Sequence, residues 1–218
     1  MSARIVYCET NWIVALAFPH HPLHREAKDL RVRASRGECE LRVPLASLLE
    51  ARGTLSDVAN QLSSAFASLR NSLATASSNG VTAFADIARA LQSDAVDQYA
   101  QRNVLSIIQD IEQDSAVRVL ADVTSNFEVL RELRSKLDFK GKDVVDLHLL
   151  AAILKDRRDN PEGPALLLSH NKKEFDPSKK RVPSELYEDA KLLWRDSFDL
   201  LTGLGQWKAK FESGAARS

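Results

Sequence analysis

Four short apolar runs, each followed by a segment of helical periodicity, limit most strongly what this chain can fold into. The runs are ARIVYC (residues 3–8), CELRVPLAS (39–47), AVRVLADV (116–123) and PALLLSH (164–170). The last is continuously apolar through ALLL, which is typical of a parallel strand that is buried on both faces. Because strands that alternate with helices usually pair in parallel, the pattern predicts an α/β fold, a doubly wound parallel sheet with helices on both faces.

The length of the chain fits one domain with an added helical part. Its 218 residues are enough for a substantial α/β domain, which we place at residues 1–200. Residues 56–113 are rich in Ala, Ser and Leu at helical spacing and form a predicted helical insertion. We interpret it as amphipathic packing helices, with a dimer face and a substrate lid as alternatives. A further helix is predicted over SELYEDAKLLWRDSFDLL (184–201), and residues 203–218 are predicted to be a disordered tail.

Charge and cysteine content exclude some classes of protein. The formal net charge is zero, so no overall field attracts nucleic acid, and any surface that binds it must be local. Cys8 and Cys39 lack metal-type spacing, and we expect buried thiols rather than a disulfide. The N-terminus has no signal-peptide pattern, and no run reaches the roughly 18–20 apolar residues of a membrane span, so we expect a cytoplasmic protein. The sequence contains neither a Gly-rich dinucleotide fingerprint nor a P-loop.

Acidic, amide and hydroxyl side chains follow the predicted strands. In an open parallel sheet, ligands bind outside the carboxyl ends of the strands, where these side chains are expected to meet. The candidates are Glu9, Thr10, Asn11, Glu50, Asp143, Asp146, Ser169 and Asn171. Asp143 and Asp146 open the helix DVVDLHLLAAIL, and their spacing places both on one face of it. An alternative is that these two carboxylates simply interact with the helix dipole.

Several carboxylates at one place require a counter-ion. At a separation of about 5 Å and an effective dielectric constant near 20, each pair repels by roughly 3 kcal/mol. The site must therefore take up protons or bind a cation. Oxygen ligands with water in the remaining positions suit Mg²⁺ or Mn²⁺. Such an ion lowers the pKa of a bound water and neutralises charge on a leaving oxygen, which is the chemistry of phosphodiester hydrolysis.

Four segments together resemble the motif regions of PIN-domain nucleases, in the same order. They are IVYCETNWIVALAF, VPLASLLEARGTL, VVDLHLLAAIL and LLLSHNKKEF, and the resemblance covers roughly residues 4–176. It implies a flavodoxin-like sheet and cleavage of single-stranded RNA with Mg²⁺ or Mn²⁺. Many members are VapC-like toxins of toxin–antitoxin pairs, and others process RNA. The partners implied are RNA, an antitoxin protein for a toxin, and a second copy of the chain as a homodimer.

The resemblance also implies roles for individual residues. The catalytic residues would be Glu9, Glu50, Asp146 and Asn171. Glu9, Glu50 and Asp146 would hold the metal, and Asp143 is either a further ligand or a helix N-terminal carboxylate. Contacts to the substrate are expected from Asn11 and Ser169. Lys172 and Lys173 belong to the densest basic run of the chain, beside the predicted site, and are expected either to contact phosphate or to form a solvated loop. A surface turn is expected for HHPLH, and structural roles are expected for His148 and His170.

Glu9 departs from the family pattern, which usually has aspartate at this position. The extra methylene adds about 1.5 Å of reach at a ligand position, and Mg²⁺ tolerates poor geometry badly. One alternative is an active site with a shifted metal or a preference for Mn²⁺. The other is a catalytically degenerate module that keeps the fold and binds RNA or protein without cutting.

Overall fold

The computed structural model describes residues 4–79, 85–87, 102, 106–121, 127–137, 144–179 and 182–212. Among them, five strands form one sheet in the order β3-β2-β1-β4-β5, with every neighbouring pair parallel. The strands are β1 (Ile5–Cys8), β2 (Glu40–Pro44), β3 (Val117–Leu120), β4 (Ala165–Leu168) and β5 (Leu192–Arg195). The predicted α/β class, the parallel sheet and the four predicted strands are therefore confirmed.

The strand order reverses at the centre of the sheet. From β1 the chain moves outward through β2 to β3, and then returns to the other side of β1 for β4 and β5. The carboxyl ends of β1 and β4 thus flank the topological switch point, where open α/β sheets bind ligands. Cys8 pairs with Leu168 in the register of these two strands, so Glu9 and Ser169 leave the sheet as neighbours.

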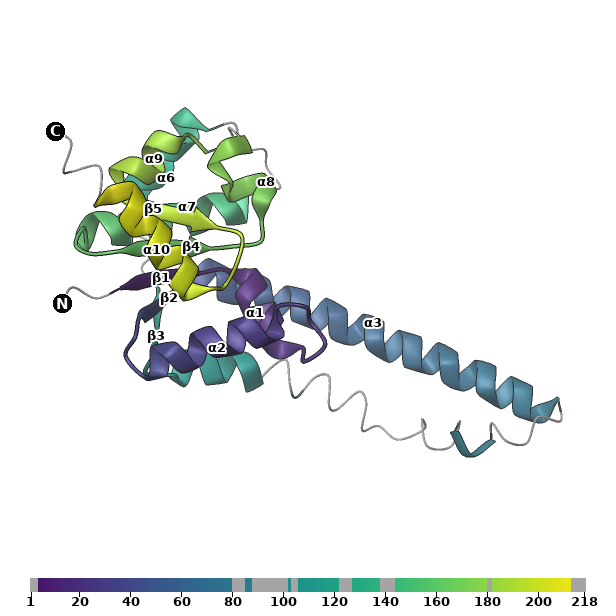
Figure 1. The fold of residues 1–218 in the computed structure, drawn as a ribbon. Coiled ribbons are helices and arrows are strands. Elements are labelled where there is room, and N and C mark those ends of the chain that lie inside the picture. Colours follow the sequence, from purple (N-terminus) through teal and green to yellow (C-terminus); the bar gives the residue numbers. More distant parts are fainter. Residues whose placement is uncertain are drawn as a thin grey trace.

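Helices cover both faces of the sheet (Figure 1). Alternate strand residues point to opposite faces, so Val6 and Cys8 join one core and Ile5 and Tyr7 the other. The first core is closed by α1 (Thr10–Ala17), α2 (His24–Ser35), the helical residues 106–113, and α10 (Leu200–Phe211). The second is closed by α6 (Phe127–Lys136), α7 (Val144–Asp159), α8 (Lys172–Phe175) and α9 (Ser184–Asp189). A short 3₁₀ turn, Pro177–Lys179, follows α8.

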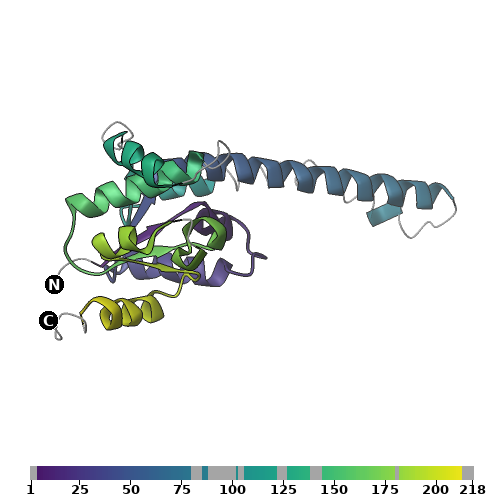
Figure 2. The same ribbon diagram turned by 90° about the horizontal axis from the view of Figure 1, so that it is seen from above.

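Helix α3 (Leu45–Ser78) is a single helix of 34 residues that starts on the sheet and extends well beyond it (Figure 1, Figure 2). It contacts α1 and α7 near its start, and its buried residues end at Ala59. The remaining 19 residues, 60–78, rise about 28 Å at 1.5 Å per residue. The start of the predicted insertion at residue 56 therefore lies inside this helix, because Gly53 does not interrupt it.

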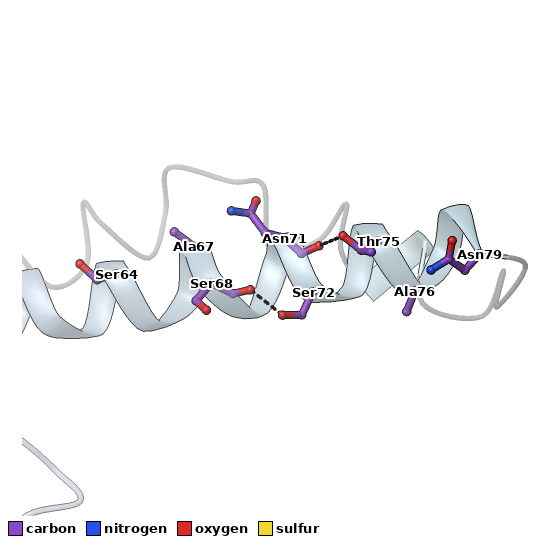
Figure 3. Close-up of a pocket in the computed structure, with 8 residues that line it drawn as sticks. All are labelled: Ser64, Ala67, Ser68, Asn71, Ser72, Thr75, Ala76 and Asn79. Carbon is purple, nitrogen blue, oxygen red and sulfur yellow. Dashed lines mark hydrogen bonds between the residues drawn. The ribbon is translucent and has the colours of Figure 1, made fainter.

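The far half of α3 carries small, uncharged side chains along one face. Seven of them, together with Asn79 at the C-cap, line a hollow of about 870 Å³ (Figure 3). The Ser72 hydroxyl donates to the Ser68 carbonyl at 3.1 Å, and the Thr75 hydroxyl donates to the Asn71 carbonyl at 2.9 Å. These two hydroxyls are thus bonded to the backbone of their own helix.

The structure corrects two predictions at the C-terminal end. The helix predicted over 184–201 is divided, since α9 ends at Asp189 and β5 follows. Residues 203–211, predicted to lie in a disordered tail, belong to α10, because Leu200, Leu204 and Trp207 are buried against the sheet. Both cysteines are free and buried, as predicted. Among the described residues, no helix has the length and apolar character needed to cross a bilayer.

Candidate active site

Glu9 follows β1 and caps the N-terminal end of α1. Its side chain accepts from the Asn11 backbone N–H at 3.1 Å and from Asn11 Nδ2 at 2.6 Å. The first N–H groups of a helix have no partner within the helix, and the helix dipole favours a negative charge there. With 3% of its surface exposed, Glu9 is fixed at the carboxyl edge of the sheet.

The Glu9 carboxyl binds its proton more tightly than an ordinary glutamate does. Burial raises its pKa to about 7, from an ordinary value of 4.5. The hydrogen bonds from Asn11 and Ser169 oppose this shift, whereas the negative charge of Glu50 adds to it. Among the described residues, the groups that act on this pKa include no cation. The ionised form of Glu9 is therefore the unfavourable one, and a positive charge brought to this place would stabilise it.

Glu50 reaches the same edge from the second turn of α3. The Thr10 hydroxyl donates to Glu50 Oε2, and it also lies 3.5 Å from the Ser47 carbonyl. Thr10 is buried and Glu50 is exposed. This contact joins two helices that follow different strands, so α1 and α3 present Glu9 and Glu50 on adjacent positions of the edge.

Asp146 and Asn171 meet on the other side of Glu9. Asn171 Nδ2 donates to Asp146 Oδ1 at 3.2 Å, which joins the end of β4 to the first turn of α7. The Asn171 backbone N–H donates to Ser169 Oγ at 2.9 Å, and the Ser169 side chain is hydrogen-bonded to Glu9. A series of hydrogen bonds, which passes through the Asn171 backbone N–H, therefore links Asp146 to Glu9. Ser169 is fully buried and supports Glu9, and its predicted contact with a substrate stays a prediction.

Lys172 and Lys173 lie exposed on α8, beside Asn171. The Lys172 ammonium is paired with Asp196 Oδ2, and this contact raises its pKa. The Lys173 ammonium lies 3.2 Å from Glu174 Oε1. Both lysines are thus placed at the rim as predicted, but each has a carboxylate beside it. A phosphate must compete with that carboxylate for the lysine.

Asp196 is a residue of this edge that the sequence reasoning missed. It directly follows β5, the strand that was hidden in the predicted helix over 184–201. Its Oδ1 lies 2.7 Å from His170 Nδ1, and the His170 ring meets Phe198 edge-on at 5.3 Å between ring centroids. His170 therefore belongs to a cluster on the β5 side of the edge. A prediction of a strand at LLWR would have identified Asp196 by the same rule that found Glu9.

The donor set fits a hydrated divalent cation. Glu9, Glu50, Asp146 and Asn171 offer oxygen ligands alone, which are those of Mg²⁺ and Mn²⁺. Among the described residues, no three side chains of His, Cys, Asp or Glu gather closely enough to enclose a metal. Mg²⁺ does not need such a cage, since it commonly keeps several waters and binds one or two carboxylates. Glu9, whose pKa is raised by burial, and the neighbouring carboxylate of Glu50 meet that requirement. Asp143 lies outside the described residues.

No protein-family model matches the chain, and no curated protein matches it. The candidate site therefore rests on the geometry of the sheet edge and on the resemblance in the four motif regions.

Proposed function

We propose that this chain is a PIN-type, metal-dependent endoribonuclease that hydrolyses phosphodiester bonds of single-stranded RNA. The observation that carries the proposal is the placement of Glu9, buried and next to Glu50, at the switch point of a parallel sheet. A second line of support is the bonded chain through Ser169 and Asn171 to Asp146. A cation bound beside Glu9 would favour the ionised form of its carboxyl, whose pKa burial raises to about 7.

Glu9 and Glu50 are the groups that would hold Mg²⁺ or Mn²⁺ directly, and Asp146 would act on the ion through one of its bound waters. When bound, the cation supplies a water of lowered pKa and neutralises charge that develops on the phosphate and on the leaving oxygen. Hydrolysis then consists of attack by water on phosphorus and cleavage of the bond to one ribose oxygen. The neutral residues fix the ligands: Asn11 holds Glu9, Thr10 holds Glu50, and Asn171 holds Asp146.

A second candidate is a catalytically degenerate PIN-like module that binds RNA or protein. One observation favours it: both carboxylate oxygens of Glu9 already accept hydrogen bonds from Asn11. A glutamate at this position therefore serves as the cap of α1, with or without a metal. Such a module has the same fold and binds RNA or protein, but it does not cleave the phosphodiester bond.

Cleavage of an unstructured RNA in Mg²⁺ or Mn²⁺, compared with EDTA, distinguishes the two candidates. Glu50→Gln should reduce the rate by more than about 100-fold, since a bound cation contributes several kcal/mol of transition-state stabilisation. The matched control is Asp57→Asn, two turns along the same helix and exposed, which should leave the rate unchanged. Cleavage that persists in EDTA contradicts the metal mechanism. Metal binding or RNA binding without cleavage favours the degenerate module.

A further inference from the structure

An apolar groove of about 430 Å³ lies directly beside the acidic edge. Its walls come from the start of α3, the end of β3 and the first three turns of α7. Leu49, Val144 and Val145 supply much of the apolar surface, and His148 and Glu50 are its polar side chains. The groove is of the size and composition of a small-ligand site, which is apolar with a few placed polar groups.

The groove exposes apolar side chains that a folded protein normally covers. Leu49 is 63% exposed, and Val144 and Val145 are each 38% exposed. Leaving such surface in water costs on the order of 25 cal/mol per Å². A stable contact with a second copy or another protein buries about 800 Å² on each partner, whereas the groove offers three well-exposed apolar side chains. They are sufficient to cover one flat ligand.

The groove and the acidic edge share residues and form one continuous surface. Glu50 lines the groove and also accepts the Thr10 hydroxyl. On α7, Val145 and His148 line the groove, whereas Asp146 between them is bonded to Asn171. A ligand whose phosphate lies at the acids therefore extends along α7 into the groove.

We propose that this groove binds a nucleobase of the RNA strand, next to the phosphodiester that lies at the acidic edge. The inference rests on the proposed ribonuclease function and names a subsite of it. A base has an apolar face, which the leucine and valine side chains cover, and a polar edge, which meets His148 and Glu50. A base enters such a groove only when it is free of a complementary strand, so the subsite favours single-stranded RNA.

The first test uses methyl NMR of the full-length protein with two small probes. Adenosine 5′-monophosphate should shift the methyl signals of Leu49, Val144 and Val145, because the base covers them. Ribose 5-phosphate should leave these signals in place, and Leu201, a 57% exposed leucine on α10, should respond to neither probe. Equal shifts with both probes, or no shift with either, overturn the proposal.

The second test uses Leu49→Ser, with Leu201→Ser as the matched control. Leu49→Ser should weaken the binding of an unstructured RNA by about fivefold, since contacts to one base contribute on the order of 1–3 kcal/mol. The affinity for an abasic strand of the same length should stay the same, and Leu201→Ser should change neither affinity. An equal loss on both strands overturns the proposal. So does a wild-type dimer that Leu49→Ser dissociates, because a second copy would then occupy the groove.

The experiments give different results if the nucleobase-site proposal is wrong and if the ribonuclease proposal is wrong. If the wild type cuts no RNA but the base-dependent methyl shifts appear, the groove is a nucleobase site on a binding module. If cleavage depends on metal but Leu49→Ser acts equally on natural and abasic strands, the activity stands and the groove proposal is wrong.

Discussion

Two carboxylates in this protein are withdrawn from water in opposite ways. The Asp156 side chain on α7 is 10% exposed, and it accepts from Arg42 Nη1 at 2.5 Å and from the Tyr7 hydroxyl at 2.7 Å. Glu9 is 3% exposed, and the partners described for it, Asn11 and Ser169, are neutral. One carboxylate has its counter-charge within the chain, and the other lies beside a second acid.

The contrast separates a structural charge from one that is available for binding. Arg42 and Asp156 bridge β2 and α7 across 114 residues of sequence. Burial and then the bond to Asp156 raise the pKa of Tyr7, so it remains a protonated donor. At Glu9 the compensating charge has to arrive as a proton or as a cation from outside. The two sites should therefore respond differently to mutation, to pH and to metal.

Breaking the compensated pair should have the largest effect on stability. Arg42→Met leaves the Asp156 charge buried without its cation and should lower the free energy of unfolding by about 3–5 kcal/mol, measured by urea denaturation. Arg118→Met is the matched control, because Arg118 is 57% exposed and lies 3.9 Å from Glu40, which also pairs with Arg42. It should cost less than about 1 kcal/mol. Similar losses in the two variants would contradict a structural role for the buried pair.

The pH dependence of stability should identify Glu9 as the uncompensated group. Its pKa of about 7 in the folded state exceeds the ordinary 4.5, so the folded state binds this proton more tightly than the unfolded state. In EDTA, its contribution is complete below about pH 4.5 and is lost as the pH rises through 7, by up to about 3 kcal/mol. Glu9→Gln should lack this loss.

The measurement is urea denaturation from pH 4 to 8 in EDTA. Glu185→Gln, a change of an exposed acid on α9, is the control and should follow the wild-type curve. If the free energy of unfolding of the wild type and of Glu9→Gln changed with pH in parallel, Glu9 would have an ordinary pKa. Glu9 would then not differ from Asp156 as an uncompensated group.

Metal should compensate Glu9 by mass action. At a Mn²⁺ concentration ten times its Kd, the folded state gains about 1.4 kcal/mol. For a chain of this size that corresponds to a rise in Tm of about 3–6 °C. Asp146→Asn and Glu9→Gln should reduce the rise, and Asp57→Asn should keep it. A rise that is unaffected by both site variants would place the metal elsewhere.

Local patterns were sufficient for β1 to β4, because each lies in a short run rich in apolar residues, and for Glu9 and Asn171, which follow β1 and β4. They were insufficient for β5. The run from 184 to 201 has helical spacing without Gly or Pro, and the chain turns at Lys191, whose φ is +46°. A left-handed lysine has no sequence signal, since tertiary contacts such as the bond from Trp207 Nε1 to its carbonyl hold it.

Long-range contacts were also beyond the sequence. The pairing of Arg42 with Asp156 and the groove at His148 depend on how α7 packs beside the sheet and α3. Helical spacing placed His148 away from Asp146, but it did not show that this direction faces a groove. The rule that functional side chains gather at the carboxyl ends of parallel strands indicates which residues come near one another. Which of their charges are compensated can be read only from the packed structure.

The smallest effect is expected at Lys172. Its pair with Asp196 is more exposed than the buried pair of Arg42 with Asp156, and unlike Glu9 it has its counter-charge within the chain. Lys172→Ala should weaken binding of single-stranded RNA only a few-fold, and should reduce the slope of log K against log salt by about 0.7, as for one phosphate contact. Asp196→Asn is the opposite change: it frees Lys172, so affinity at low salt should rise. Binding is measured by fluorescence anisotropy at several salt concentrations, with Lys173→Ala as the neighbouring comparison. If the Lys172→Ala slope equals that of the wild type, the Lys172 ammonium pairs with Asp196 and makes no contact with phosphate. The Lys172–Asp196 pair then carries its own counter-charge, as Arg42 with Asp156 does.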